Sequence, residues 1–208
     1  MSAIEELYPT PCAFCRISSA YPPESSDVPQ SPDPERVDPQ CHLILSAPLV
    51  LAFLDIMPIS PGHILLTTRR HYRTLGDLPA SKTNDTWVAR RAAEEARDTS
   101  RALGEWLPII SRALCKVTGI EDWNVVQNNG ERAAQVVPHI HFHLIPRYQE
   151  GRQEAQHSGR TDSALKSWKM FGRGSREDLD DDEARELANR LRDAIKTEVE
   201  IGSKTSKL

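Results

Sequence analysis

The sequence predicts an α+β domain with a mainly antiparallel sheet of about five strands and two main helical regions. The strand-like segments are short, and most follow one another without a helix between them. Helical character is concentrated in two stretches, one in the middle of the chain and one near its end. Parallel strands need a long crossover for each connection, so this order favours antiparallel pairing.

Five short segments rich in apolar and β-branched residues are expected to form the strands. They are residues 43–45, 49–56, 64–68, 122–127 and 139–145. Pro58, Pro61 and Gly62 separate the second strand from the third, and Pro146 ends the fifth. The turn-forming residues 128–130 (Asn-Asn-Gly) follow the fourth strand.

The two helical regions have different signals. Residues 85–117 contain many alanines, but Gly104 and Pro108 are expected to divide this stretch, and Gly119 is a suitable C-terminal cap. The second helix is expected after the acidic residues 178–183, which suit the positive end of the helix dipole. Its apolar positions recur at helical spacing: Leu187, Leu191, Ala194 and Ile195.

Composition sets limits on function. The 208 residues are 38% hydrophobic and 27% charged, as in globular proteins, and the formal net charge is -4. This charge argues against nucleic acid as a partner, although a pocket for one nucleotide stays possible. No apolar run is long enough to cross a bilayer, and residues 1–6 lack a secretory signal, so we expect no membrane partner and a location inside the cell. Residues 17–40, rich in Pro and Ser, are expected to form a loop or linker without packed elements.

The four cysteines are unevenly spaced. Cys12 and Cys15 form a C-x-x-C pair, which in a reducing compartment indicates half of a zinc site, a redox motif or two inert thiols. A redox pair usually follows a strand, and the residues before Cys12 do not resemble one, so zinc is favoured. Cys41 and Cys115 are expected to be ordinary buried or half-buried residues.

Three histidines alternate along the fifth predicted strand. Side chains of successive strand residues point to opposite faces, so His139, His141 and His143 share one face and the apolar residues between them share the other. The stripe spans roughly 13 Å at about 3.3 Å per residue, which is awkward for one metal ion bound by all three. A simple metal site on two of them and a fortuitous polar face are the alternatives to a catalytic surface.

The residues around this stripe resemble the signature of the histidine-triad (HIT) superfamily. The resemblance is most specific at 135–147 and extends to 53–58, 61–63 and 69–71. It covers about residues 10–16 and 43–148. The resemblance implies a HIT-like fold, a domain over residues 1–148 with an insertion at 17–40, and a homodimer. Residues 149–208 would form an extension with one helix and a flexible tail.

The resemblance also implies a chemistry that suits imidazole. His141 would attack the α-phosphorus of a nucleotide to form a nucleotidyl-histidine that water hydrolyses, while His143 would hold a phosphate oxygen and help to protonate the leaving group. Asp55 would bind the ribose, and Asn128 and Gln135 would contact the phosphate or the leaving group. Asp55 and Asn128 could instead be turn residues, and His63 is either structural or part of the site.

A structural zinc site follows from the same resemblance. Family members with an N-terminal C-x-x-C pair imply the ligands Cys12, Cys15, His71 and His139 in this chain. Four sulfur and nitrogen ligands close a tetrahedral site, so the zinc would be structural and no catalytic cofactor is expected.

The details of the motif favour one branch of the superfamily. The third histidine favours hydrolysis over transfer to a sugar phosphate, and Asp55, Asn128 and the C-x-x-C pair resemble the Hint-like branch. The expected substrate is a purine nucleotide derivative, either a nucleoside phosphoramidate or an adenylate. Val136 departs from the serine often found there, which keeps open the Fhit-like alternative, a dinucleoside polyphosphate hydrolase. A zinc-stabilised nucleotide-binding regulatory protein with little turnover is the non-enzymatic alternative.

The end of the chain carries a separate signal. Ser206-Lys207-Leu208 matches a peroxisomal matrix address, which predicts an import receptor as partner and a peroxisomal location, with the cytoplasm as the alternative. Further upstream, Trp168, Met170 and Phe171 are expected either to pack against the core or to cover the pocket.

Overall fold

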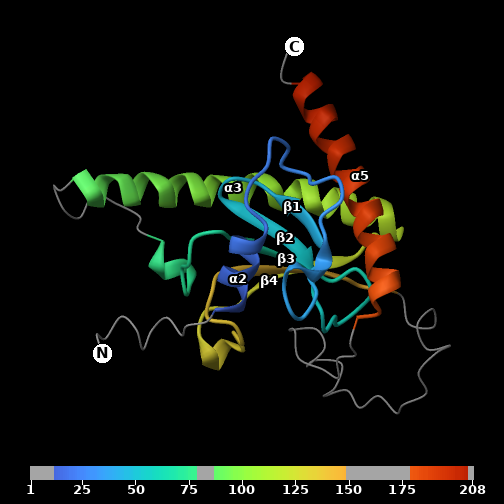
Figure 1. Cartoon of the computed structure of the whole chain (residues 1–208), viewed down its shortest axis with the longest axis horizontal. Helices are drawn as coiled ribbons and strands as arrows, with labels where there is room; N and C mark the ends of the chain where they lie inside the picture. Colours follow the sequence, from blue (N-terminus) through green and yellow to red (C-terminus); the bar gives the residue numbers. More distant parts are fainter. Residues whose placement is uncertain (1–11, 79–86, 149–178, 206–208) are drawn as a thin grey trace.

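The computed structural model describes residues 12–78, 87–148 and 179–205 of the chain (Figure 1). Ser206, Lys207, Leu208, Trp168, Met170 and Phe171 lie outside these residues, so peroxisomal import and the role of the aromatic segment stay predictions. Among the described residues, no helix has the length and apolar character needed to cross a bilayer.

A five-stranded antiparallel sheet forms the centre of the fold. Its strands are β1 (Leu43–Ser46), β2 (Val50–Leu54), β3 (Ile64–Thr68), β4 (Trp123–Gln127) and β5 (His141–Pro146). They lie in the order β1-β2-β3-β5-β4, and every neighbouring pair is antiparallel. The predicted α+β class and the five-stranded sheet are therefore confirmed.

The described residues form three α-helices around this sheet. They are α2 (Ala13–Ala20), α3 (Trp87–Thr118) and α5 (Asp181–Thr205). Short 3-10 helices are also present among these residues: η1 (Pro34–Arg36), η2 (Leu75–Asp77) and η3 (Glu131–Ala133). In Figure 1, α3 runs across the sheet and continues beyond its edge, while α5 crosses α3 at a steep angle.

The expected division of the middle helix is wrong, because α3 is one continuous helix with Pro108 inside it. Proline at this position has no N–H to donate to the carbonyl of Gly104, four residues earlier. Both residues lie on the exposed side of the helix, where water can hydrogen-bond that carbonyl. The neighbouring side chains Trp106 and Ile110 are buried in the core and hold both halves of the helix against the sheet.

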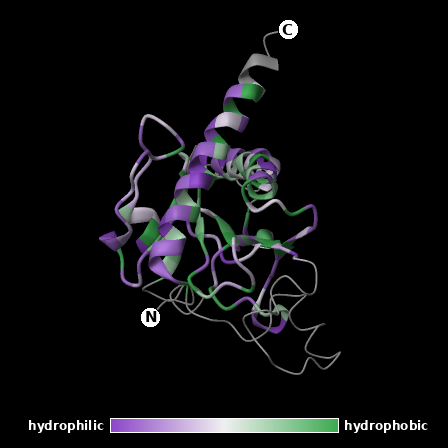
Figure 2. Ribbon diagram, turned by 90° about the vertical axis from the view of Figure 1, so that its right-hand side faces the viewer, coloured by the Kyte–Doolittle hydropathy of each residue, from purple (hydrophilic) through white to green (hydrophobic). Residues whose placement is uncertain are grey.

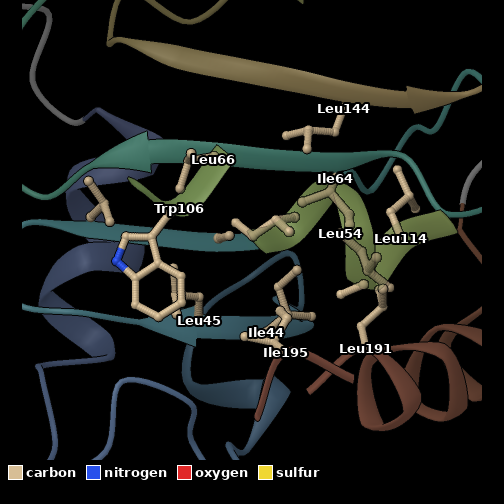
Figure 3. Packing of buried hydrophobic residues seen from close by; sticks show 14 of the residues in the cluster. Ile44, Leu45, Leu54, Ile64, Leu66, Trp106, Leu114, Leu144, Leu191 and Ile195 are labelled. Atoms are coloured by element: carbon tan, nitrogen blue, oxygen red, sulfur yellow. The ribbon is translucent and has the colours of Figure 1, made fainter. Parts of the chain in front are cut away.

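The main core lies between one face of the sheet and the helices α3 and α5. Figure 3 shows side chains of β1, β2, β3 and β5 packed against Trp106 and Leu114 of α3 and Leu191 and Ile195 of α5. In Figure 2 much of the sheet ribbon is coloured hydrophobic, whereas much of the α5 ribbon is coloured hydrophilic. Ile140 and Leu144 belong to this core, as predicted, so alternation sends His141 and His143 to the opposite face.

The opposite face of the sheet is covered by α2 and the segment that follows it. The expectation that residues 17–40 contain no packed element is wrong, because α2 continues to Ala20 and both Tyr21 and Val28 are buried. The guanidinium of Arg69, at the end of β3, donates to the carbonyls of Tyr21 (2.9 Å) and Ala47 (2.6 Å). A guanidinium has five N–H donors, so this one side chain ties the segment to the sheet where prolines prevent regular backbone pairing.

Candidate active site and metal centre

His141 and His143 lie on β5, which is hydrogen-bonded to a strand on each side. His141 is opposite Thr67 of β3, and His143 is opposite Leu65 of β3 and Val126 of β4. The strand begins two residues later than predicted, because the backbone N–H of His139 donates to Val137 (2.8 Å) instead of to the ladder. The sheet therefore fixes two histidines on one face, and the third lies just before the strand.

His141 has the geometry of an oriented nucleophile. Its Nδ1 lies 2.7 Å from the backbone carbonyl oxygen of His139, and the Phe14 ring contacts it edge to face with ring centroids 5.2 Å apart. A carbonyl oxygen only accepts hydrogen bonds, so Nδ1 carries the proton and Nε2 carries the lone pair. The side chain is buried, which keeps its orientation fixed.

His143 ends a chain of polar contacts that we call the Asp–His–His chain, made of Asp55, His63 and His143. His63 Nε2 lies 3.0 Å from His143 Nδ1, and the Ile59 backbone N–H donates to His63 Nδ1 (3.2 Å). With Nδ1 accepting, neutral His63 carries its proton on Nε2 and donates it to His143, whose own proton is then on Nε2. Asp55 Oδ2 lies 3.3 Å from His63 Nδ1 and would stabilise a protonated His63. His63 therefore links Asp55 to His143.

The second group of sequence-predicted residues also meets in space. Cys12, Cys15, His71 and His139, which we call the Cys–His cluster, bring four possible ligand atoms within 4.8 Å of one another. The sulfur–nitrogen distances are 3.4 Å from Cys12 to His139, 3.2 Å from Cys15 to His71 and 3.7 Å from Cys15 to His139, in each case to Nδ1. The opposite nitrogen of His139, Nε2, donates to the Thr68 carbonyl (2.8 Å), so the lone pair of Nδ1 points to the cysteines. The cluster can hold a metal ion.

The charge states in the Cys–His cluster follow from its burial. Burial, with His71 close by, lowers the pKa of His139 to about 4, so its imidazole is neutral near pH 7. Burial and the adjacent Cys12 raise the pKa of Cys15 to about 12, which keeps the thiol protonated unless a positive charge compensates. A divalent cation would provide that charge and convert thiols to thiolate ligands.

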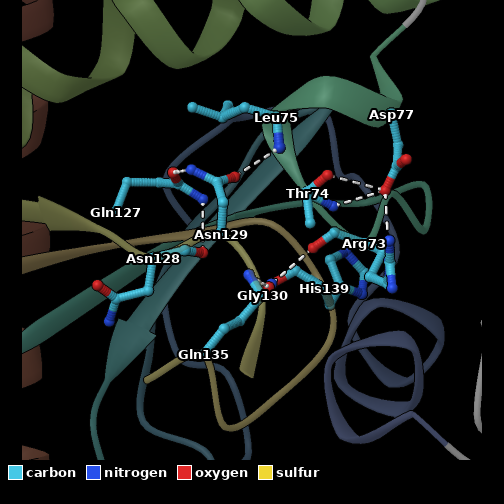
Figure 4. A network of polar contacts seen from close by, with 10 residues as sticks. All are labelled: Arg73, Thr74, Leu75, Asp77, Gln127, Asn128, Asn129, Gly130, Gln135 and His139. Atoms are coloured by element: carbon cyan, nitrogen blue, oxygen red, sulfur yellow. Dashed lines mark hydrogen bonds and ion pairs between the residues drawn. The ribbon is translucent and has the colours of Figure 1, made fainter. Parts of the chain in front are cut away.

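The loop between β4 and β5 holds the two other predicted substrate-binding residues (Figure 4). Gln135 is buried; its Oε1 accepts from the Gly130 N–H (2.7 Å), and its Nε2 donates to the Arg73 carbonyl (2.5 Å). Asn128 begins the loop, and its backbone carbonyl accepts from the Gln127 side chain (3.0 Å). Gln135 thus ties the loop to the segment after β3, and the substrate contacts of both residues stay predictions.

Two residues that support the site have no signal in the sequence. Thr68 accepts from His139 through its carbonyl, and Phe14 packs against both His139 and His141. Threonine in a strand and phenylalanine in a short helix are ordinary, so only the arrangement in space reveals these roles.

Comparisons with known proteins agree with this arrangement. An adenylylsulfatase HINT3 of Arabidopsis thaliana is 30% identical over 136 residues, which cover 65% of this chain and 52% of that protein. An adenosine 5'-monophosphoramidase hnt1 of Schizosaccharomyces pombe is 30% identical over 139 residues, or 67% of this chain and 76% of that protein. The alignment thus spans about half of the first relative and three quarters of the second.

A similar fold is found in a solved structure. A hypothetical histidine triad nucleotide-binding protein of Sulfolobus tokodaii superposes with a TM-score of 0.58 and 18% identity, covering 89% of this chain and 93% of that one. The family model of the HIT domain matches residues 37–150, more than half of the chain. The sheet, the oriented histidines and this match together show that the chain belongs to the histidine-triad (HIT) domain family.

Proposed function

We propose that this protein hydrolyses the α-phosphate linkage of a purine nucleotide derivative, a nucleoside phosphoramidate or an adenylate. The observation that carries the proposal is the 2.7 Å contact between His141 Nδ1 and the His139 carbonyl, which leaves the lone pair on Nε2. The relatives support the class of substrate, since one is named an adenylylsulfatase and the other an adenosine 5'-monophosphoramidase.

The reaction has two steps on His141. In the first, Nε2 attacks the α-phosphorus, a P–N or P–O bond to the leaving group breaks, and a nucleotidyl-histidine forms. In the second, water attacks the same phosphorus, the P–Nε2 bond breaks, and the nucleoside monophosphate leaves. Because the carbonyl of His139 accepts from Nδ1, it stabilises the imidazole as positive charge develops during the first step.

His143 assists the same reaction as a hydrogen-bond donor. The Nε2 proton assigned to His143 by its contact with His63 can bind a phosphate oxygen and then pass to the leaving group. Asp55 would accept from the ribose hydroxyls, while Asn128 and Gln135 would act near the phosphate. Ile56 and Met57 beside Asp55 are 40% and 43% exposed, as expected for side chains that a bound base could contact.

We further propose that the Cys–His cluster holds a structural zinc ion. Zinc–sulfur bonds of about 2.3 Å and zinc–nitrogen bonds of about 2.0–2.1 Å at tetrahedral angles separate sulfur from nitrogen by roughly 3.6 Å. The three sulfur–nitrogen distances, 3.2, 3.4 and 3.7 Å, are close to this value. When bound, zinc would join α2 to the segment before β5 and to His71, and its closed coordination would leave catalysis to His141 and His143.

The expected homodimer stays a proposal. β4 is an edge strand, and its residues Trp123 and Val125 are 39% and 45% exposed on one face. An exposed apolar edge strand is a suitable place for a second copy to pair. Light scattering of the purified full chain would measure the oligomeric state, and a monomer at all concentrations would refute the proposal.

The proposed function is tested with a panel of substrates. Adenosine phosphoramidate, adenylylsulfate and diadenosine triphosphate are incubated with the wild-type protein and with His141→Ala, and release of AMP is measured. We expect AMP release from one of the first two, and none with the variant. Preference for diadenosine triphosphate would instead favour the dinucleoside polyphosphate hydrolase, and AMP binding without turnover would favour the regulatory protein.

A further inference from the structure

The short segment that carries Asp55 is held in place on both sides of that residue. Before it, the Leu54 backbone N–H donates to the His42 carbonyl (3.1 Å). After it, the Ile56 carbonyl accepts from the Leu179 backbone N–H (2.9 Å). Leu179 lies two residues before α5, so one of these contacts comes directly from the C-terminal part of the chain.

The other contact also depends on α5, through His42. The His42 side chain is 3% exposed, and its Nε2 donates to Oδ1 of Asp181, the first residue of α5, at 3.1 Å. Because a carboxylate only accepts, this bond fixes the tautomer and the ring orientation of His42. α5 therefore fixes the position of His42, the residue whose carbonyl accepts from the Leu54 N–H.

A third contact anchors α5 itself beside this point. Arg192 is buried, donates to the Leu43 carbonyl (2.6 Å) and also contacts Asn189 on the same helix. A buried guanidinium is costly unless its donors are paired, so this contact keeps α5 in register with β1. The helix therefore reaches residues 42, 43 and 56, which surround Asp55 in the fold.

We propose that the start of α5, through Asp181 and Leu179, positions Asp55 for recognition of the ribose hydroxyls, so that this C-terminal segment determines affinity for the nucleoside. The inference rests on the proposed role of Asp55 as a ribose ligand. Asp181 and Leu179 are positioning residues that act through His42 and Ile56 and do not touch the nucleotide. Loss of either contact lets the 54–57 segment move and weakens nucleoside binding, without a direct effect on His141.

The structure offers a matched pair of variants. Asp181→Ala removes the contact to His42, whereas Asp182→Ala removes a carboxylate from the same first turn that pairs with Arg185 in an exposed ion pair. Both variants lose the same favourable charge at the helix start, so the pair differs in the contact to His42. A second pair of variants distinguishes the effect of the backbone contact from that of the side chain. Leu179→Pro removes the N–H that donates to the Ile56 carbonyl, and Leu179→Ala retains it.

The readout is binding of AMP and of 2′-deoxy-AMP to the full chain, measured by calorimetry. One net hydrogen bond corresponds to roughly a 3- to 10-fold change in affinity, so we expect AMP binding to weaken by that factor in Asp181→Ala and Leu179→Pro. The preference for AMP over 2′-deoxy-AMP should fall by a similar factor. Asp182→Ala and Leu179→Ala should keep both the affinity and the preference.

Each other outcome counts against the proposal. Equal affinity and preference in Asp181→Ala and Asp182→Ala would overturn it, even if Leu179→Pro fails to fold. Turnover is measured separately from binding. A wild-type protein that binds AMP but releases no product would contradict the proposed hydrolysis, and the binding comparison would still decide whether α5 positions Asp55. A wild-type protein that does not bind AMP would overturn both.

Discussion

The Cys–His cluster and the Asp–His–His chain lie on the same face of one sheet and contain similar ligand types, but their internal contacts differ. Each brings ligand atoms within 4.8 Å of one another. In the Cys–His cluster the close pairs are thiol sulfur and imidazole nitrogen, which are weak hydrogen-bond partners but good zinc ligands. In the Asp–His–His chain the two imidazoles match a donor to an acceptor, with His63 Nε2 3.0 Å from His143 Nδ1. The contacts inside a cluster, more than its residue types, indicate whether it suits a metal or proton transfer.

The largest effect is expected from removing His141, the proposed nucleophile, which lies between the Cys–His cluster and the Asp–His–His chain. His141→Ala should lower kcat on the preferred adenylate by on the order of 10⁴-fold or more, because the variant lacks the nitrogen proposed to form the covalent intermediate. Steady-state kinetics measure the loss. The zinc content and the melting temperature should stay close to wild type, and comparable turnover by the variant would refute the assignment.

The second-largest effect is expected from removing the zinc ion proposed for the Cys–His cluster. Cys12→Ser, or removal of zinc by a chelator, should lower the free energy of unfolding by about 4 kcal/mol, the contribution of a ligand present at a thousand times its Kd. Metal analysis and thermal unfolding measure both changes. Cys115→Ser is the control, because Cys115 lies on α3, outside the cluster. A wild-type protein that contains no metal after expression with zinc, and unfolds like Cys12→Ser, would contradict the proposal.

The third prediction addresses the Asp–His–His chain. His63→Ala should lower kcat by about 10- to 100-fold, as expected when a group that orients a functional side chain is removed, with a smaller change in KM. In the His143→Ala background the same substitution should add little, because His63 acts through His143. A double-mutant cycle on kcat measures this coupling. Additive losses would show that His63 acts independently of His143.

The smallest effect concerns the turn that presents His63. Gly62 has φ +86°, and a Cβ there would lie 3.2 Å from the Thr118 side chain and 3.3 Å from that of Pro146, so Gly62→Ala should cost about 1–3 kcal/mol of stability. Gly104→Ala on the exposed side of α3 meets nothing within 4 Å and should add about 0.5–1 kcal/mol instead. Denaturant unfolding measures both, and equal effects would contradict the strain assigned to Gly62.

Local patterns predicted most of the sheet and the placement of the histidines. Alternation alone placed His141 and His143 opposite the apolar core, and all five strand bounds agree with the predicted ranges within two residues at each end. The break expected at Pro108 was wrong because burial of Trp106 and Ile110 outweighs one missing backbone hydrogen bond. That error came from local propensity, which tertiary packing can override.

Local patterns could not predict the contacts between residues that are far apart in the sequence. His42 and Asp181 are 139 residues apart in sequence, and Cys15 and His71 are 56 apart. The second pair was expected only through the family resemblance, and the first was not expected at all. Neither spacing nor residue type distinguishes His63 as a donor to His143, because that role depends on how two strands are placed side by side.

The covalent intermediate on His141 is tested most directly by a single-turnover reaction of excess wild-type protein with adenosine phosphoramidate, stopped quickly and analysed by intact and peptide mass spectrometry. Phosphoramidate bonds to histidine are labile in acid, so the reaction is stopped under denaturing, alkaline conditions. We expect one adenylyl group attached to the peptide that contains His141 and none in His141→Ala. AMP formation without any adduct, or an adduct on another residue, would contradict it.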